Sequence, residues 1–309
     1  MILNTGSRTD IPAYYSEWFY NRIETGFVLV RNPYHPELVT KYRLDPEVVD
    51  ILCFCSKNPK PMLPGLSKIA AYRQFWFVTI TPYGKEIEPN VPESAQVIET
   101  VRQLSGIVGQ KAVAWRYDPI FLSEKYTAEY HVEQFEKMSA ALQGKIAFCV
   151  ISFIDLYEKT RRNFPQVRAV TKEEQEFLVK RFAEIGCKYR IPIRTCCENQ
   201  KLGKFGVETS GCMTQEVLEQ GTGCLLSVPT KKKASRAECN CLLGADIGAY
   251  NTCPHGCLYC YANYDKQTVL QNFRHHDPTS PFLIGTGHPE DQIREAVQES
   301  WIDGQLRLF

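Results

Sequence analysis

The sequence lacks any apolar run long enough to cross a bilayer, and it lacks an excess of charge of either sign. Hydrophobic residues make up 44% and charged residues 23% of the 309 residues, which is near the globular average. The net charge is +1, so no overall field favours nucleic acid or an anionic membrane. The chain also does not start with a basic region followed by an apolar stretch. We therefore expect a cytoplasmic protein with no membrane partner, and nucleic acid is a disfavoured partner.

Cysteine, by contrast, is abundant and unevenly distributed. The chain has 13 cysteines, of which three precede Cys187 and ten lie between Cys187 and Cys260. An odd number in a chain without an export signal argues against a disulfide framework. Metal or redox chemistry, concentrated late in the chain, is the better interpretation.

Short β-rich runs alternate with helical patterns along the first two thirds of the chain. Apolar residues recur at helical spacing before Gly109 and Gly144, and a capping box at Thr171 and Glu174 begins a third helix. Repeated strand and helix units predict a parallel sheet, and about eight such units would close it into a barrel. We expect an α/β fold with a TIM-like or partial (β/α) barrel, and an open doubly wound sheet is the alternative. The predicted strands span residues 1–4, 27–31, 51–55, 75–81, 112–117, 147–153, 191–195 and 205–208.

Three segments with different composition divide the chain. We expect a barrel domain over 1–211 and a cysteine-rich iron–sulfur region over 212–264 that completes the barrel. A C-terminal tail over 265–309 shows little periodicity before a short helical pattern at 290–300.

Polar residues follow the predicted strands, where a parallel barrel carries its reactive groups. Arg116 and Asp118 end one strand, and Glu198 follows another. We predict catalytic or substrate-holding roles for these three residues. The alternative for Arg116 with Asp118 is a structural ion pair, which is common outside active sites.

The strongest motif is the run Cys253-Pro-His-Gly-Cys257-Leu-Tyr-Cys260, with the spacing C-x3-C-x2-C. Three thiolates this close can bind three irons of a cubane cluster and leave the fourth iron without a protein ligand. A structural zinc site normally needs four protein ligands, so a 4Fe-4S cluster fits this spacing better.

The stretch CPHGCLYCYAN, residues 253–263, resembles the signature of the radical S-adenosylmethionine enzymes and is especially similar to that of spore photoproduct lyase. The resemblance implies that S-adenosylmethionine chelates the open iron and that Tyr259 lies against its adenine. It also implies cofactor contacts for Tyr261 and Asn263, and an electron donor such as flavodoxin or ferredoxin. One electron would cleave the sulfonium and release a 5′-deoxyadenosyl radical that abstracts hydrogen from an unknown substrate.

The position of the motif departs from the usual pattern of that superfamily. Its cysteines usually follow the first barrel strand, whereas here they follow a series of strand and helix units, so the order is apparently permuted. If residues 246–251 form the strand that delivers the cysteines, that strand could lie beside the N-terminal strand. The glycine-glycine-glutamate element that usually receives the cofactor's amino group has no clear match.

The whole chain is similar to an uncharacterised bacterial family known only as a domain of unknown function, whose C-terminal cysteines look like the radical cluster site. The similarity includes SRTDIP, WRYDPI, SFIDLY and the terminal QLRLF. It implies no substrate.

The remaining late cysteines could form a second site. Cys239 and Cys241 form a C-x-C pair, and with Cys197 and Cys212 they would supply four thiolates for an auxiliary cluster or a zinc ion. The alternative is that they are buried free cysteines. We expect His255, inside the first motif, to face solvent.

Two further functions compete with the radical enzyme. One is an iron–sulfur protein that senses redox state or transfers electrons without cleaving the cofactor. The other is a lyase acting on DNA photoproducts, which the near-neutral charge disfavours.

Overall fold

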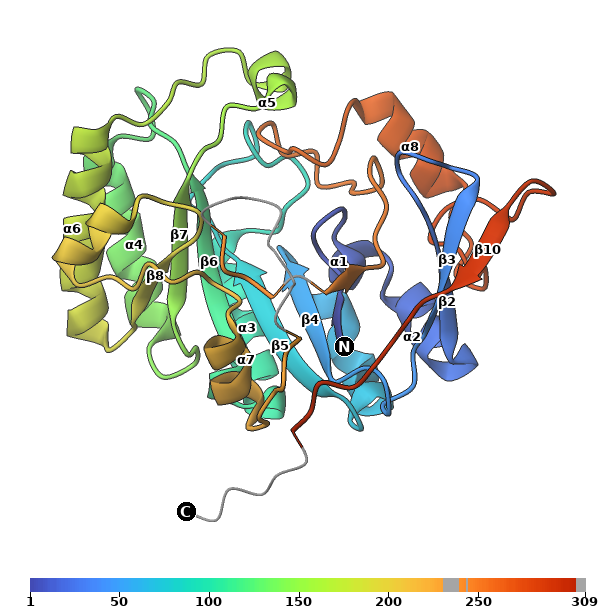
Figure 1. The fold of residues 1–309 in the computed structure, drawn as a ribbon. Helices are drawn as coiled ribbons and strands as arrows, with labels where there is room; N and C mark the ends of the chain where they lie inside the picture. The colour runs from blue at the N-terminus through green and yellow to red at the C-terminus, as the bar shows by residue number, and fades with distance from the viewer. Residues whose placement is uncertain (230–238, 243, 304–309) are drawn as a thin grey trace.

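Seven parallel strands form the central sheet of the protein (Figure 1). This computed structural model describes residues 1–229, 239–242 and 244–303, so the QLRLF motif lies outside the described residues. The strand order is β8-β7-β6-β5-β4-β1-β9, and β8 and β9 are the edges of an open sheet. The strands are β1 (Ile2–Asn4), β4 (Ile51–Ser56), β5 (Arg73–Thr79), β6 (Val113–Ile120), β7 (Cys149–Phe153), β8 (Ile193–Thr195) and β9 (Ala245–Asp246).

The strand order distinguishes the two architectures expected from the sequence. From β1 to β8 each new strand of the sheet is added on the same side of the previous one, as in a barrel. A doubly wound sheet would instead reverse direction at a switch point. The fold is therefore an open α/β sheet consistent with a partial barrel.

The last strand pairs with the first. β9 adds to β1 in parallel, with Leu3 opposite Ala245 and Asn4 opposite Asp246. The segment that precedes the cysteine motif thus lies beside the N-terminal strand as expected, but the strand is Ala245–Asp246, so Asp246 alone of the predicted residues 246–251 belongs to it. Only two residues form this strand, and the described residues contain no pairing that closes the sheet into a barrel.

Helices connect the strands, and most of them cover the outer face of the sheet (Figure 1). Helix α6 begins at the predicted capping box, in which Thr171 accepts from the Glu174 backbone and Glu174 accepts from the Thr171 backbone. The helices are α1 (Ile11–Tyr14), α2 (Ser16–Thr25), α3 (Ser94–Val108), α4 (Ala128–Leu142), α5 (Glu158–Asn163), α6 (Lys172–Tyr189), α7 (Gln215–Thr222) and α8 (Lys266–Arg274), with 3-10 helices η1 (Lys60–Ile69), η2 (Gln110–Ala112) and η3 (Gln200–Phe205).

Alternation along the strands gives the sheet two different faces. On the outer face, Trp76 stacks on Phe54 and Trp115 stacks on Phe135 of α4. On the inner face, Arg116 lies over the ring of Phe77, and Phe75 packs against Gly221 of α7. The inner face therefore carries both apolar packing and the polar residues of β6.

Three strands form a separate small sheet in the order β10-β3-β2. They are β2 (Phe27–Arg31), β3 (Leu38–Arg43) and β10 (Gln292–Glu295). The strand predicted at 27–31 exists but belongs to this sheet, because it pairs antiparallel with β3. The helix predicted at 290–300 is wrong. Residues 292–295 form an exposed strand that pairs with the edge of β3.

The strand predicted at 205–208 is also wrong. Residues 200–205 form η3, and Glu208 makes only an isolated parallel bridge with Arg194 of β8. Gly206, whose φ is +84°, ends η3 in a left-handed conformation and prevents the extended run.

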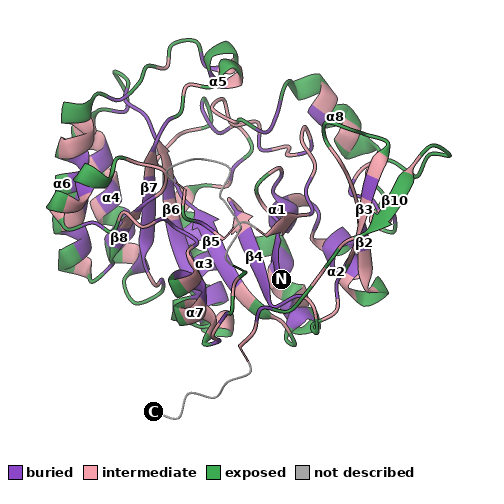
Figure 2. Cartoon of the chain, in the orientation of Figure 1, coloured by how far each residue is buried: buried purple, intermediate pink, exposed green. Residues whose placement is uncertain are grey.

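One hydrophobic core extends from the first residues to the tail. It includes Leu3 and Val78 of the sheet, Cys212 and Leu218 of the cysteine-rich segment, and Trp301 near the C-terminus. Figure 2 shows the strands buried between layers whose outer helix surfaces are exposed. None of the helices formed by the described residues is long and apolar enough to cross a membrane.

A buried histidine in α4 makes stability depend on pH. His131 Nε2 donates to the Phe121 carbonyl at 2.9 Å, and its Nδ1 lies 2.7 Å from the Tyr117 hydroxyl. Burial lowers the pKa of His131 to about 4, so the folded protein binds this proton less readily than the unfolded chain. The stability that neutral His131 contributes is present above about pH 6.5 and is lost as the pH falls towards 4.

We expect His131 to account for a loss of up to about 3 kcal/mol in unfolding free energy between pH 7 and pH 4. His131→Gln should show a smaller dependence on pH than the wild type in urea denaturation at a series of pH values. His35→Gln, at an exposed histidine, is the matched control and should follow the wild type. Identical slopes for His131→Gln and wild type would contradict the assignment.

Candidate metal and cofactor site

The cysteine motif lies at the carboxyl edge of the sheet, directly after β9. Asp246, the last residue of β9, accepts hydrogen bonds from Ser7 N at 2.8 Å and from Gly248 N at 2.7 Å. These bonds hold the chain that leaves β9 against the chain that leaves β1. In parallel α/β folds this edge is where ligands bind.

Backbone hydrogen bonds fix the cysteine loop to the loop that follows β5. Leu258 N donates to the Ile87 carbonyl at 3.0 Å, and Asn90 N donates to the His255 carbonyl at 3.1 Å. Gly256 has a φ of +72°, a conformation that favours glycine. The turn between Cys253 and Cys257 is therefore shaped before any ligand binds.

His255 does not face solvent, and that prediction is wrong. The residue is 3% exposed, and its Nε2 lies 2.8 Å from Asp10 Oδ2. Its Nδ1 lies 3.0 Å from the Tyr14 hydroxyl. Asp10 also accepts from Lys57 N at 2.8 Å and from Ala13 N at 3.0 Å. A buried aspartate thus joins the cysteine loop to α1 and to the end of β4.

The three motif thiols share one electrostatic environment. Burial raises the pKa of Cys253, Cys257 and Cys260, and the neighbouring thiols of the motif raise it further for Cys253 and Cys257. Without a cation the thiols stay protonated, whereas bound iron would deprotonate them.

A buried ion pair lies beside these thiols. Lys57 donates to Glu88 at 2.9 Å, Thr81 donates to the same oxygen at 2.7 Å, and the Tyr259 hydroxyl donates to it as well. Burial lowers the pKa of Lys57, but Glu88, Cys257 and Asp118 outweigh this effect and raise it. Lys57 therefore stays charged, and it interacts electrostatically with Cys257 of the cysteine loop and with Asp118 of β6.

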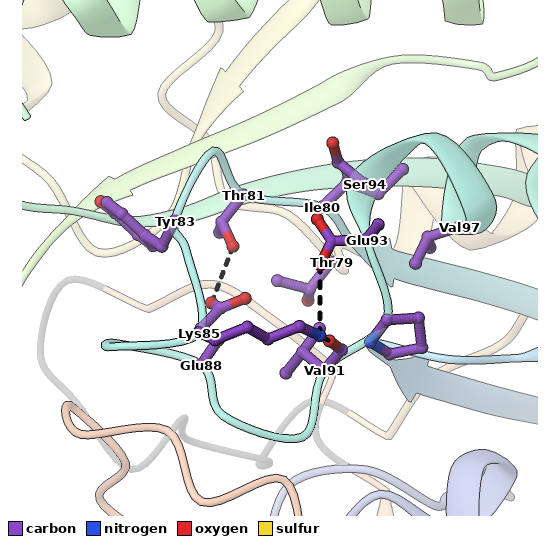
Figure 3. A pocket seen from close by; sticks show the side chains of 11 residues that line it. Thr79, Ile80, Thr81, Tyr83, Lys85, Glu88, Val91, Glu93, Ser94 and Val97 are labelled. Carbon is purple, nitrogen blue, oxygen red and sulfur yellow. Dashed lines mark hydrogen bonds and ion pairs between the residues drawn. The ribbon is translucent and has the colours of Figure 1, made fainter.

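Figure 3 shows the pocket behind this pair, where Thr81 points towards Glu88. Its volume of about 10 Å³ is room for a single water molecule. The pocket therefore serves the hydrogen-bond network around Glu88 and has no room for a substrate.

The other two predicted cofactor contacts occupy different environments. Tyr261 is 49% exposed and donates to the Ser7 carbonyl at 2.6 Å. Asn263 is buried, and its Nδ2 donates to the Cys253 carbonyl at 2.8 Å. The Asn263 Oδ1 atom has no hydrogen-bond partner among the described residues. A buried acceptor without a partner beside the cysteine loop is a feature that a bound donor would satisfy.

The predicted catalytic residues gather on the inner face of the sheet. Arg116 Nε donates to Asp118 Oδ2 at 3.0 Å, and Ser152 donates to the other oxygen of Asp118. Glu198 accepts from Phe153 N at 2.7 Å, and burial raises its pKa to about 8. Arg116 and Asp118 thus form an ion pair with each other while remaining partly exposed, with side-chain accessibilities of 17% and 19%.

A second group of thiols lies next to Arg116. Cys212 Sγ is 3.4 Å from both Cys196 Sγ and Cys241 Sγ, and Arg116 Nη1 is 3.5 Å from Cys212 Sγ. The sulfurs of Cys196, Cys212 and Cys241 all lie within 4.8 Å of one another and could bind a metal or an iron–sulfur cluster. Cys197 was the predicted ligand, but its neighbour Cys196 is the member of this compact group.

The remaining predicted ligands of the second site lie close to that group. Hydrogen bonds with Cys197, Cys212 and Cys241 lower the pKa of Cys196. Cys197 makes thiol contacts with Cys196 and with Cys239. Of the four predicted cysteines, Cys212 and Cys241 belong to the compact group with Cys196, and Cys197 and Cys239 lie next to it.

Sequence reasoning missed the importance of Asp10 and Glu88. Asp10 lies in SRTDIP, which indicates only a family resemblance, and no pattern in residues 84–91 indicates a role for Glu88. The signal available was weak, because an acidic residue after a strand becomes informative only when its partner is known.

These features define a class: an α/β protein with two groups of cysteines at the carboxyl edge of an open parallel sheet. The chain belongs to the family described as a domain of unknown function, DUF1848, whose model matches residues 2–262 and so includes every cysteine. No curated protein matches the chain.

We expect Asp10→Ala to lower the unfolding free energy by about 2–3 kcal/mol, because it removes a helix cap and leaves the buried His255 without its acceptor. Asp265→Ala removes only the cap of the exposed α8 and should cost about 1 kcal/mol or less. Urea denaturation of the metal-free proteins measures both values. Equal losses for the two variants would show that the bond between Asp10 and His255 contributes nothing.

Proposed function

We propose that the protein is a radical S-adenosylmethionine enzyme that binds a 4Fe-4S cluster through Cys253, Cys257 and Cys260. The observation that carries the proposal is a preformed C-x3-C-x2-C loop at the ligand-binding edge of a barrel-like sheet. The bound cluster would supply the electron that cleaves S-adenosylmethionine and yields a 5′-deoxyadenosyl radical.

The residues around the loop fit a charged cofactor. The Lys57 ammonium lies 5.5 Å from the centre of the Tyr259 ring, which the family resemblance assigns to the adenine. Asn263 offers an unpaired acceptor, and Tyr261 is accessible beside it. Glu88 is a buried carboxylate in direct contact with Tyr259, so it is the best candidate among the described residues for the missing acidic element.

The substrate would bind on the inner face, where Arg116, Asp118 and Glu198 lie. The Arg116 guanidinium can hold an anionic or carbonyl group, and a protonated Glu198 can donate a hydrogen bond. An oxygen-sensitive cluster of this kind would work in the cytoplasm with an electron donor of the flavodoxin or ferredoxin type.

Two alternatives rest on the same loop. An iron–sulfur protein for electron transfer would hold the cluster without cleaving the cofactor, and a DNA photoproduct lyase would cleave it while acting on damaged DNA. The balanced charge of the chain favours a small substrate over DNA.

The proposed cluster is tested by measuring the iron and sulfide content of the protein. Anaerobically reconstituted wild type should hold about four irons and matching sulfide at this site. The variant Cys253→Ala/Cys257→Ala/Cys260→Ala should lose them, because no other ligands hold the cluster. Cys187→Ala, at an exposed cysteine, is the matched control and should keep the wild-type content. Unchanged iron and sulfide content in the triple variant would contradict the assignment of these three cysteines as cluster ligands.

Cofactor cleavage is tested by its product. Dithionite-reduced wild type given S-adenosylmethionine should release 5′-deoxyadenosine, detected by mass spectrometry, even without a substrate. The triple cysteine variant should give only the level of an enzyme-free control. A fully loaded wild type that forms no 5′-deoxyadenosine would favour the electron-transfer function, and consumption of photoproducts in irradiated DNA would favour the lyase.

A further inference from the structure

The second thiol group joins segments from opposite edges of the open sheet. Cys196 directly follows β8, which is one edge, and Cys241 precedes β9, which is the other. Cys212 lies in the connection between them, ahead of α7. Sequence-distant segments with three converging thiols are typical of a metal-stabilised structure.

The separation of the sulfurs indicates how many ions they share. Two thiolates on one tetrahedral zinc, with zinc–sulfur bonds of about 2.3 Å, lie about 3.8 Å apart. The distances from Cys212 Sγ to Cys196 Sγ and to Cys241 Sγ are both 3.4 Å, so a small outward movement would admit one ion. The wider spacing of a cubane would require a larger rearrangement of two packed segments.

The surroundings of the group also suit bound thiolates. Met213 N donates to Cys241 Sγ at 3.3 Å, and Arg116 donates to Cys212 Sγ at 3.5 Å. Such donors offset the negative charge of several thiolates on a divalent ion. The return bond from Leu242 N to the Met213 carbonyl, at 2.8 Å, fixes the two segments relative to each other.

We propose that Cys196, Cys212 and Cys241, with Cys197 as the fourth ligand, bind one divalent ion of the zinc class that ties the two edges of the sheet together. Cys197 is chosen because it adjoins Cys196 in the chain and its thiol is close enough to that of Cys196 to form a hydrogen bond. Binding displaces the thiol protons and involves no change in oxidation state. The site is independent of the cluster and of S-adenosylmethionine cleavage.

The test uses the full chain carrying Cys253→Ala, Cys257→Ala and Cys260→Ala, so that iron of the proposed cluster is not counted. This protein, purified with zinc, should hold one zinc per chain by elemental analysis. Adding Cys212→Ala should weaken zinc binding by more than about tenfold, because it removes the central ligand. Adding Cys224→Ala should leave zinc binding unchanged, since this buried cysteine of the same region lies outside the group.

Cobalt separates loss of a ligand from loss of the fold. Cobalt in the parent protein should show the visible bands of a tetrahedral thiolate site. Cys212→His keeps a ligand, so it should still bind cobalt but with weaker sulfur-to-metal charge-transfer absorption. Cys197→Ala should weaken binding, whereas Cys239→Ala should not.

Three results would overturn the proposal. They are iron with inorganic sulfide in place of a single ion, equal zinc in the parent and Cys212→Ala proteins, and a parent protein that binds no divalent metal. A stronger effect of Cys239→Ala than of Cys197→Ala would overturn the assignment of the fourth ligand. None of these results depends on whether the reduced wild type cleaves S-adenosylmethionine.

Discussion

The pairing of β9 with β1 is the contact on which the arrangement of both thiol groups depends. Only two residues of each strand are in register, Leu3 with Ala245 and Asn4 with Asp246. Gly244 makes this approach feasible, because a Cβ there would lie 1.9 Å from the Ile2 carbonyl oxygen. This short ladder positions the loop that follows β9, which carries the cysteine motif, at the carboxyl edge of the sheet. Cys241, which precedes β9, then lies on the inner face.

Buried polar contacts reinforce this pairing where the ladder itself is short. Asp246 caps the turn after β9, and Asp10 holds His255 of the cysteine loop. A buried carboxylate is costly unless its partners satisfy it, and Asp10 has three donors or donor-capable partners. The same residues that position the cysteine loop therefore also link the N-terminal segment to the end of β4.

Most of the central sheet could be predicted from the sequence because its strands are continuous apolar runs. Phe54 and Trp76 belong to such runs, which are typical of parallel strands covered on both faces. β9 has no such signal, since Ala245 and Asp246 become a strand only by pairing with β1. The weak helical pattern at 290–300 did not indicate that residues 292–295 pair with the open edge of β3, through backbone bonds and an ion pair between Lys41 and Glu295.

The motif of the first site could be predicted because its ligands are consecutive in sequence, whereas the details of both sites depend on distant partners. His255 is buried by Asp10, which lies 245 residues away along the chain. The choice between Cys196 and Cys197 depends on the backbone, because adjacent side chains point in different directions. Cys197 has a φ of +57°, a conformation that an ordinary strand-end residue would not be assigned from sequence.

The two thiol groups differ in what they require of the fold when no metal is bound. The motif thiols sit on one short loop held by backbone bonds to residues 84–91, so the loop keeps its shape while the thiols are protonated. The thiols of the second group come from separate segments of the chain. Within the described residues, the guanidinium of Arg116 is in direct contact with this group, where it donates to Cys212 Sγ. Arg116 also forms the ion pair with Asp118, so charge at the second group is coupled to the polar residues on the inner face of the sheet. Thiolates bound to a metal there would compete with Asp118 for the Arg116 guanidinium and so affect the polarity of the inner face.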